Sequence, residues 1–242
     1  MMIKDFSAGE HTAALWAQVR PTITEIEALP FLNRLANGSL DARAFTNYIL
    51  QDGLYLAHYA RAMALLAAKA HSRAEARFWA GAAATAIEVE EGMHGALLAD
   101  TLLAPEREAL LTGTDAPVPS PTTLGYVSWL IAIAATESYA LGVAGVLPCF
   151  WIYAHVGKVL VQRARALGEG HPYRTWVDTY DSEVFDASTR QAVAILESEL
   201  VRADAAERAR MAAVFAQACT YELHFWAMAH RLQAWELSPG ND

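Results

Sequence analysis

Two stretches without a charged side chain, Ala116 to Thr136 and Ser138 to Ala154, follow each other in this sequence and are separated only by Glu137. Each is long enough for a hydropathy window to mark it as a membrane span. Prolines crowd the start of the first stretch, however, and two glycines and Pro148 interrupt the second. We therefore interpret both stretches as helices of a buried core, and we expect no membrane as a partner.

The composition agrees with a helical globule built around such a core. Hydrophobic residues make up 54% of the 242 residues and charged residues 19%, alanine is frequent, and runs of β-branched residues are few. A chain of this length fits within one large domain. The proline-rich segment 112–121 is then a connection inside that domain. We predict an all-α fold, a single-domain multi-helix bundle that spans residues 1–242.

The net charge and the cysteine content limit which partners and which cellular compartment we expect for this chain. The formal net charge is −9, and no cluster of lysine and arginine could follow a phosphate backbone, so we expect no nucleic acid as a partner. The two cysteines, Cys149 and Cys219, lie far apart and provide neither a disulfide framework nor a four-ligand zinc site. Residues 1–7 lack the apolar core of a secretion signal. These features predict a cytoplasmic protein.

Cys149 directly follows Pro148 inside the second apolar stretch. Proline lacks a backbone N–H and its ring crowds the preceding turn, so Pro148 should either kink the helix or restart it. We expect helix over 122–146 before this point and from Cys149 to about residue 167 after it. At a helix N-terminus the unpaired N–H groups and the macrodipole lower the pKa of a thiol and make its sulfur a better nucleophile. The alternative is a small buried cysteine among aromatic residues, since free cysteines are often buried.

A second candidate lies in the helix expected over residues 41–70. One carboxylate and three phenols follow each other there at spacings of four, three and four residues: Tyr48, Asp52, Tyr55 and Tyr59. These spacings place them on one face of the helix, where a purely structural face would carry aliphatic side chains. The pattern indicates either a ligand-binding face or an aspartate that hydrogen-bonds to neighbouring tyrosine hydroxyls.

The last predicted helix, over residues 205–237, contains a carboxylate among large aromatic side chains. Glu222 lies one turn before Phe225 and Trp226, so it shares a helix face with them. A carboxyl group in apolar surroundings has its pKa raised and can hold a proton near neutral pH. Glu222 is therefore a candidate general acid.

Glu91 and His94 form the only Glu-x-x-His pair in the sequence. Helical bundles that bind two irons use two such pairs together with two further glutamates. A lone pair is more typical of a solvated acidic face or of a hydrogen-bonded histidine. We therefore expect no metal and no cofactor.

A series of short motifs extends over nearly the whole chain. They are Leu15-Trp16 with Pro21, Pro30-Phe31 with Gly38-Ser39-Leu40, Tyr48-Ile49-Leu50-Gln51-Asp52 with Tyr55-Leu56, Leu147-Pro148-Cys149-Phe150-Trp151-Ile152-Tyr153, His171-Pro172-Tyr173, Trp176-Val177-Asp178-Thr179-Tyr180 and Tyr221-Glu222-Leu223-His224-Phe225-Trp226-Ala227-Met228-Ala229. In their order and spacing they resemble the TenA-type thiaminase II family, the aminopyrimidine aminohydrolases of thiamin salvage. Within that resemblance, Pro148-Cys149 is typical of the branch that contains a cysteine.

The resemblance implies a fold, an assembly and a set of site residues. The implied fold is all-α and of the haem-oxygenase-like type, and the implied assembly is a homotetramer with a closed pyrimidine pocket and no metal. Cys149 is the implied nucleophile and Glu222 its acid/base partner. Asp52 is implied to hydrogen-bond the aminopyrimidine edge. The side chains implied to shape and orient the site are Tyr55, Tyr126 and Tyr180.

The implied reaction is hydrolysis at the 5-methylene of a 4-amino-2-methylpyrimidine, either aminomethylpyrimidine from degraded thiamin or thiamin itself, to give hydroxymethylpyrimidine. Water is a poor nucleophile at this carbon, and covalent catalysis by a cysteine divides one high barrier into two lower ones. Two alternatives belong to other classes. One is a metal-dependent oxidase or oxygenase on the same fold, suggested by Glu91 and His94. The other is a relative that binds aminopyrimidines without converting them.

Overall fold

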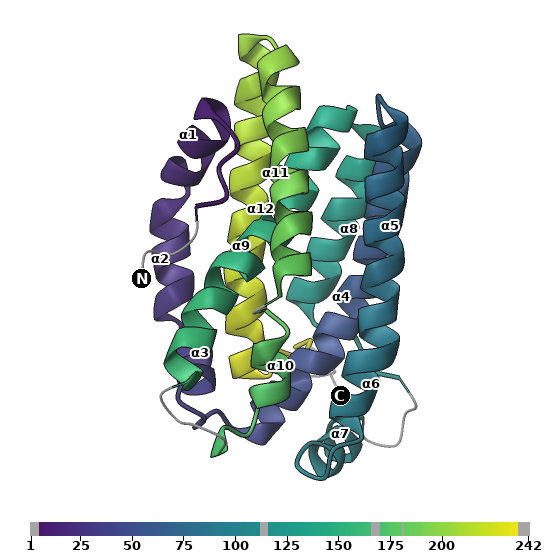
Figure 1. The fold of residues 1–242 in the computed structure, drawn as a ribbon. Helices are drawn as coiled ribbons and strands as arrows, with labels where there is room; N and C mark the ends of the chain where they lie inside the picture. Colours follow the sequence, from purple (N-terminus) through teal and green to yellow (C-terminus); the bar gives the residue numbers. More distant parts are fainter. Residues whose placement is uncertain (1–4, 112–115, 166–169, 181, 237–242) are drawn as a thin grey trace.

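The protein is described by a computed structural model that covers residues 5–111, 116–165, 170–180 and 182–236 (Figure 1). These residues form helices and connecting loops, and no strand occurs among them. In chain order the helices are α1 (Glu10–Gln18), α2 (Arg20–Ala28), α3 (Pro30–Ala36), α4 (Ala42–Lys69), α5 (Arg73–Val89), the π turn η1 (Glu90–His94), α6 (Gly95–Leu98), α7 (Ala104–Leu111), α8 (Pro121–Thr136), α9 (Tyr139–Arg165), α10 (Arg174–Asp178), α11 (Glu183–Arg202) and α12 (Ala205–Arg231). The all-α prediction is confirmed.

Helix α9 is the central helix of the bundle, in contact with α12, α11, α8 and α4 (Figure 1). Its residues from 139 to 157 are all buried except Cys149, which is half-buried. By length and hydropathy α9 meets the criteria for a membrane span, and its apolar window is fully enclosed by the rest of the molecule. The second apolar stretch therefore forms a core helix, as predicted.

Helix α8, which contains most of the first apolar stretch, buries only one of its faces. Tyr126, Leu130 and Ala134 point inward, whereas Leu124 is 41% exposed. The first apolar stretch thus contributes one face to the core, and its other face is exposed because α8 packs on α4, α9 and α12 from one side only.

The break between the two apolar helices lies at Glu137 and Ser138, and not at Pro148. Glu137 has extended backbone (φ −94°, ψ 175°) and ends α8. Helix α9 passes through Pro148 without interruption. The alternative in which Pro148 restarts the helix is therefore wrong. Proline inside a helix costs about 3 kcal/mol, and the almost complete burial of the surrounding side chains offsets that cost.

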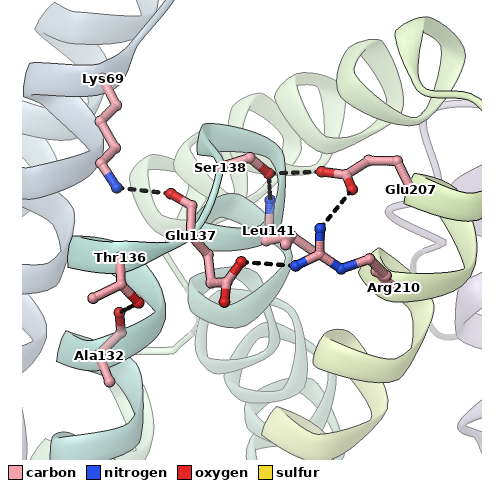
Figure 2. Close-up of polar contacts among 8 residues, drawn as sticks. All are labelled: Lys69, Ala132, Thr136, Glu137, Ser138, Leu141, Glu207 and Arg210. Atoms are coloured by element: carbon pink, nitrogen blue, oxygen red, sulfur yellow. Dashed lines mark hydrogen bonds and ion pairs between the residues drawn. The ribbon is translucent and has the colours of Figure 1, made fainter.

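Polar contacts hold the actual break (Figure 2). The ammonium group of Lys69 donates to the carbonyl oxygen of Glu137 at 2.8 Å, which satisfies one of the unpaired carbonyls after α8. Ser138 Oγ donates to Glu207 Oε1 at 2.7 Å, and Arg210 bridges Glu137 and Glu207 at 2.7 and 3.1 Å. Glu137, the single charged residue between the two apolar stretches, therefore marks the turn from α8 to α9.

The two other helices that were expected to carry functional residues are present. Helix α4 matches the prediction for residues 41–70, and the Asp41 carboxylate caps it by accepting from two backbone N–H groups. Helix α12 starts as predicted but ends at Arg231, because Leu232 takes left-handed backbone (φ 50°). Since α4, α9 and α12 contact one another, side chains from all three helices meet in the interior.

Candidate active site

A cavity of about 750 Å³ lies between α5 and α11, with α4 and α9 beneath it. Polar side chains line its inner end: Asp52, Tyr59, Cys149, Tyr153 and Tyr180. Exposed residues of α5 and α11 line its mouth: Arg77, Gly81, Thr85, Val184 and Gln191. Aliphatic, aromatic and methionine side chains form most of the wall between these two ends. The cavity therefore combines an apolar passage with a polar inner end.

Cys149 lies ten residues beyond Tyr139, the first residue of α9, and its half-buried side chain lines the cavity. Burial raises the pKa of the Cys149 thiol well above its ordinary value, and the nearby Glu222 carboxylate raises it further. The nearby hydroxyls of Tyr55 and Tyr59 act on this pKa in the opposite direction. The prediction that a helix N-terminus lowers this pKa is wrong, because α9 does not begin at Cys149.

Glu222 comes from α12 and is 1% exposed. Burial raises the pKa of its carboxyl to about 8, Asp52 adds to the shift, and a hydrogen bond from Tyr126 opposes it. That bond joins Tyr126 Oη to Glu222 Oε1 at 2.7 Å. At neutral pH the Glu222 carboxyl therefore holds a proton for most of the time, which is the state of a general acid.

Asp52 comes from α4, is 5% exposed and lines the cavity. Its Oδ2 atom lies 3.2 Å from Nε2 of His94, the last residue of η1, and His94 is itself 3% exposed. The two carboxyl groups of the site thus have different partners: a phenol hydroxyl for Glu222 and an imidazole for Asp52. Different partners allow two carboxyls in one site to take different roles.

Stacked tyrosines enclose the thiol from the side of α4 and α8. The ring of Tyr55 lies 5.2 Å from that of Tyr59 and 5.0 Å from that of Tyr126, and Tyr126 stacks on Tyr221 at 4.8 Å. Burial raises the pKa of the Tyr55, Tyr59 and Tyr126 phenols well above the ordinary value, so they stay protonated. The hydroxyl of Tyr55 has no aligned hydrogen-bond partner among the described residues, which leaves it available to the sulfur.

Tyr180 closes the inner end from the segment after α10. Its carbonyl oxygen accepts from Lys158 Nζ at 3.2 Å, and its ring lies 4.8 Å from that of Trp176. Gly157 of α9 packs so tightly against Tyr180 that a β-carbon at this glycine would overlap Cβ and Cγ of the tyrosine. The position of Tyr180 therefore depends on α9 as well as on its own segment.

The six residues predicted for the site come together in this region. Asp52, Cys149 and Tyr180 line the cavity itself. The other three are enclosed beside Cys149 and interact with it electrostatically: Tyr55, Tyr126 and Glu222. One alternative for Asp52 was a hydrogen bond with neighbouring tyrosine hydroxyls. The described ion-pair partner of this carboxylate is instead His94.

Three further residues of the site were not among the six predicted for it, although Tyr59 lies on the helix face that was considered for a ligand. Tyr59 donates to the carbonyl oxygen of Val146 at 2.8 Å, and the hydroxyl of Tyr153 pairs with that of Tyr48 at 2.8 Å. A sequence signal existed for both tyrosines, because each lies one helical turn after a predicted site residue, Tyr55 and Cys149. His94, the third, was expected on a solvated acidic face or as a hydrogen-bonded histidine. It is buried beside Asp52, so the solvated face is wrong.

The described side chains provide no set of ligands for a metal ion. No group of three or more histidine, cysteine, aspartate and glutamate residues among them is arranged to hold a metal ion. The side chain of Glu91 lies outside the described part of the structure.

Relatives of known name cover most of this chain. The multifunctional thiamine biosynthesis protein ThiED of Corynebacterium glutamicum is 37% identical over 227 residues, which are 93% of this chain and 27% of that protein. An aminopyrimidine aminohydrolase of Bacillus subtilis is 30% identical over 207 residues, 85% of this chain and 84% of that enzyme. The chain thus spans less than a third of the length of ThiED from two Corynebacterium species but most of the length of the Bacillus enzyme.

Solved structures support the fold. A TenA homologue from P. horikoshii superposes with a TM-score of 0.79 at 25% identity and covers 92% of this chain and 99% of its own. A domain of unknown function with a heme oxygenase-like fold, from Shewanella denitrificans, superposes with a TM-score of 0.67 at 15% identity and covers 93% of this chain and 94% of its own. The model of the TENA/THI-4/PQQC family matches residues 16–232, so the chain belongs to that family.

Proposed function

We propose that this protein is an aminopyrimidine aminohydrolase, a thiaminase II that releases hydroxymethylpyrimidine in thiamin salvage. The observation that carries the proposal is the grouping of one thiol with two carboxyls: Cys149 and Asp52 line the same cavity, and Glu222 is buried beside the thiol. The names of relatives from Bacillus subtilis and two other bacteria, all called aminopyrimidine aminohydrolase, support the same reaction.

The substrate binds with its pyrimidine ring at the inner end of the cavity. Asp52 accepts a hydrogen bond from the 4-amino group, because a buried carboxylate needs a donor and the amino group supplies one. Tyr153 and Tyr180, whose ring centroids are 5.6 Å apart, supply aromatic surface and exclude water. This placement brings the ring beside the sulfur of Cys149.

Covalent chemistry follows from the proton that Glu222 holds. The Cys149 sulfur forms a bond to the ring carbon next to the one that bears the methylene. Glu222 gives its proton to a ring nitrogen and takes up the proton of the thiol, so no free thiolate has to persist in the buried site. This sequence is consistent with the raised pKa of both the Cys149 thiol and the Glu222 carboxyl.

The remaining steps release the product. The electron-rich ring expels the amine, which leaves with the electron pair of the bond to the methylene and takes the proton of the Glu222 carboxyl. Water then adds its oxygen to the methylene and gives a proton back to Glu222. The bond between sulfur and ring carbon breaks, and the proton of the ring nitrogen passes to the sulfur. One water is consumed, one amine and one hydroxymethylpyrimidine are formed, and Cys149 and Glu222 regain their starting states.

The size of the cavity favours a second substrate, thiamin itself. A volume of about 750 Å³ falls in the range for drug-sized ligands, about 300–1,000 Å³. A single substituted pyrimidine does not fill such a space. The apolar passage past Phe78, Met93 and Phe185 gives room for a second ring as the leaving group.

The test is a comparison of two substrates. The purified protein is incubated separately with aminomethylpyrimidine and with thiamin, hydroxymethylpyrimidine is measured by liquid chromatography, and kcat/KM is compared. We expect product from at least one substrate and a ratio that identifies the preferred leaving group. If neither substrate yields product while both bind, the protein is a binding relative and the proposal is wrong.

A further inference from the structure

His94 lies behind one of the two carboxyls of the site. Its Nε2 is 3.2 Å from Asp52 Oδ2, and both side chains are at least 95% buried. Asp52 lines the cavity, whereas His94 is not among the described residues that do so. The imidazole therefore approaches the carboxylate from the side opposite to a bound ligand.

The imidazole has little else to interact with. Neither ring nitrogen makes an aligned hydrogen bond to a described residue, and Asp52 is its only ion-pair partner among them. A buried polar group without a partner costs free energy, so the approach to Asp52 needs a reason. Hydrogen bonds of a catalytic site are often poorly aligned without ligand and tighten when the ligand binds.

The backbone that carries His94 is unusual. Residues 90–94 form a π turn, η1, between α5 and α6. A π turn holds more residues than an α turn, so it changes the direction of the side chains that follow, and such turns are frequent at functional sites. Here Met93 lines the cavity while the next residue, His94, reaches Asp52 behind it.

We infer that His94 is a positioning residue: it donates from Nε2 to Asp52 Oδ2 and so presents Oδ1 of Asp52 to the amino group of the bound aminopyrimidine. The inference rests on the proposed function and adds a residue to it. His94 acts only through Asp52 and does not touch the substrate.

The experiment compares two replacements of the imidazole. In His94→Gln the side-chain amide nitrogen can take the place of Nε2, whereas in His94→Asn it reaches only the place of Nδ1. Binding of hydroxymethylpyrimidine is measured by calorimetry, and kcat and KM are measured with aminomethylpyrimidine. We expect His94→Asn to raise Kd and KM about 10- to 100-fold, as for the loss of a hydrogen bond to a charged group, with a smaller change in kcat. We expect His94→Gln to stay within about threefold of wild type.

A double-mutant cycle shows whether the effect passes through Asp52. In the background of Asp52→Ala, the change His94→Asn should alter Kd by less than about twofold, because the contact is already lost. A matched control is His155→Asn, which removes another histidine–carboxylate pair outside the cavity, the contact of buried His155 Nε2 with half-buried Glu27 at 2.6 Å. It should lower the Tm without a change in Kd.

Four results would overturn the inference. One is equal binding by His94→Asn and wild type, and another is an equally large loss in the Asp52→Ala background. If His94→Asn does not fold, His94→Gln decides alone, and a loss of more than about tenfold in this folded variant rejects the inference. If wild type neither binds nor converts aminopyrimidines, the proposed function fails and this inference with it. If wild type is active but the His94 variants give one of the first three results, only the inference on His94 is rejected.

Discussion

The inner end of the cavity and its mouth differ in how closely their residues are packed and paired. At the inner end, polar groups are buried and interact with one another, as in the pairs Tyr126–Glu222 and His94–Asp52. At the mouth, Gly81 has no atom within 4 Å of the place where a β-carbon would stand, and Val184 is 81% exposed. The polar groups at the inner end are held by their partners, whereas the mouth leaves open space beside its residues.

Because of this difference, we expect the inner end to determine the rate of the reaction and the mouth to determine the choice of leaving group. A buried polar group has no water to replace a lost partner, so a substitution at the inner end changes pKa values, orientation and rate. A residue at the mouth has solvent beside it, so a substitution there changes only which leaving group fits. We expect the effects of substitutions to fall from the inner end outward, and the predictions below follow that order.

The largest effect is expected for the thiol. We predict that Cys149→Ala lowers kcat/KM by about 10³-fold or more, because the covalent route is lost. Since Cys149 already lines a cavity, its truncation should change the free energy of unfolding little. Kinetics with both substrates and urea unfolding measure the two quantities.

The other cysteine is the matched control. Cys219 is 0% exposed and does not line the cavity, so Cys219→Ala should lower the free energy of unfolding by about 1 kcal/mol and leave kcat/KM unchanged. Turnover that survives in Cys149→Ala and disappears in Cys219→Ala would reverse the assignment of the two residues.

Sequence reasoning reached further at the inner end than one would expect from local rules alone. Glu222 was recognisable because a lone carboxylate beside Phe225 and Trp226 has to be buried with them. Asp52 was recognisable from its spacing to tyrosines on one face of α4. Both inferences need only the periodicity of a helix.

Other features depend on contacts between distant segments and were not accessible in this way. The cost of Pro148 inside α9 is offset by neighbours from α4, α11 and α12, so the helix continues where a local rule ends it. The π turn before His94 has no signature in the sequence, and the overlap between Gly157 and Tyr180 appears only after α9 and α10 have packed.

The next largest effect concerns the proton on Glu222. We predict that Glu222→Gln lowers kcat/KM by about 10²- to 10³-fold, the range for loss of a general acid. The pKa of this carboxyl is raised from 4.5 to about 8 in the folded protein, mainly by burial. Between these values the folded state holds a proton that the unfolded state lacks, so stability falls as pH rises toward 8.

The variant should remove this pH dependence from the free energy of unfolding. Urea unfolding of wild type and Glu222→Gln from pH 5 to pH 9 tests it, with a difference in slope of at most about 1.4 kcal/mol per pH unit. Tyr126→Phe sharpens the test, because loss of its hydrogen bond should raise the pKa of Glu222 further and shift the alkaline limb of the rate profile upward. Parallel pH dependences in wild type and Glu222→Gln would show that another group titrates.

An intermediate effect is expected where α9 supports Tyr180. A β-carbon at Gly157 overlaps the tyrosine, so Gly157→Ala should displace Tyr180 and raise KM about tenfold. Gly145→Ala on the same helix is the control, because the nearest atom to its new β-carbon, from Val214, lies at 3.4 Å. Kinetics with aminomethylpyrimidine should separate the two variants. Equal KM values would mean that Tyr180 does not shape the substrate site.

The smallest effect is expected at the mouth, where the change concerns selectivity. Gly81 is exposed inside α5 and lines the cavity, with open space beyond it. Gly81→Leu should lower kcat/KM for thiamin about three- to tenfold, because the new side chain fills the passage for a second ring, and should leave aminomethylpyrimidine turnover unchanged. Gly81→Ala is the control and should stabilise α5 by about 0.5–1 kcal/mol with both activities intact. An equal loss with both substrates would mean that the mouth acts on the chemistry, and the contrast between the two ends of the cavity would not hold.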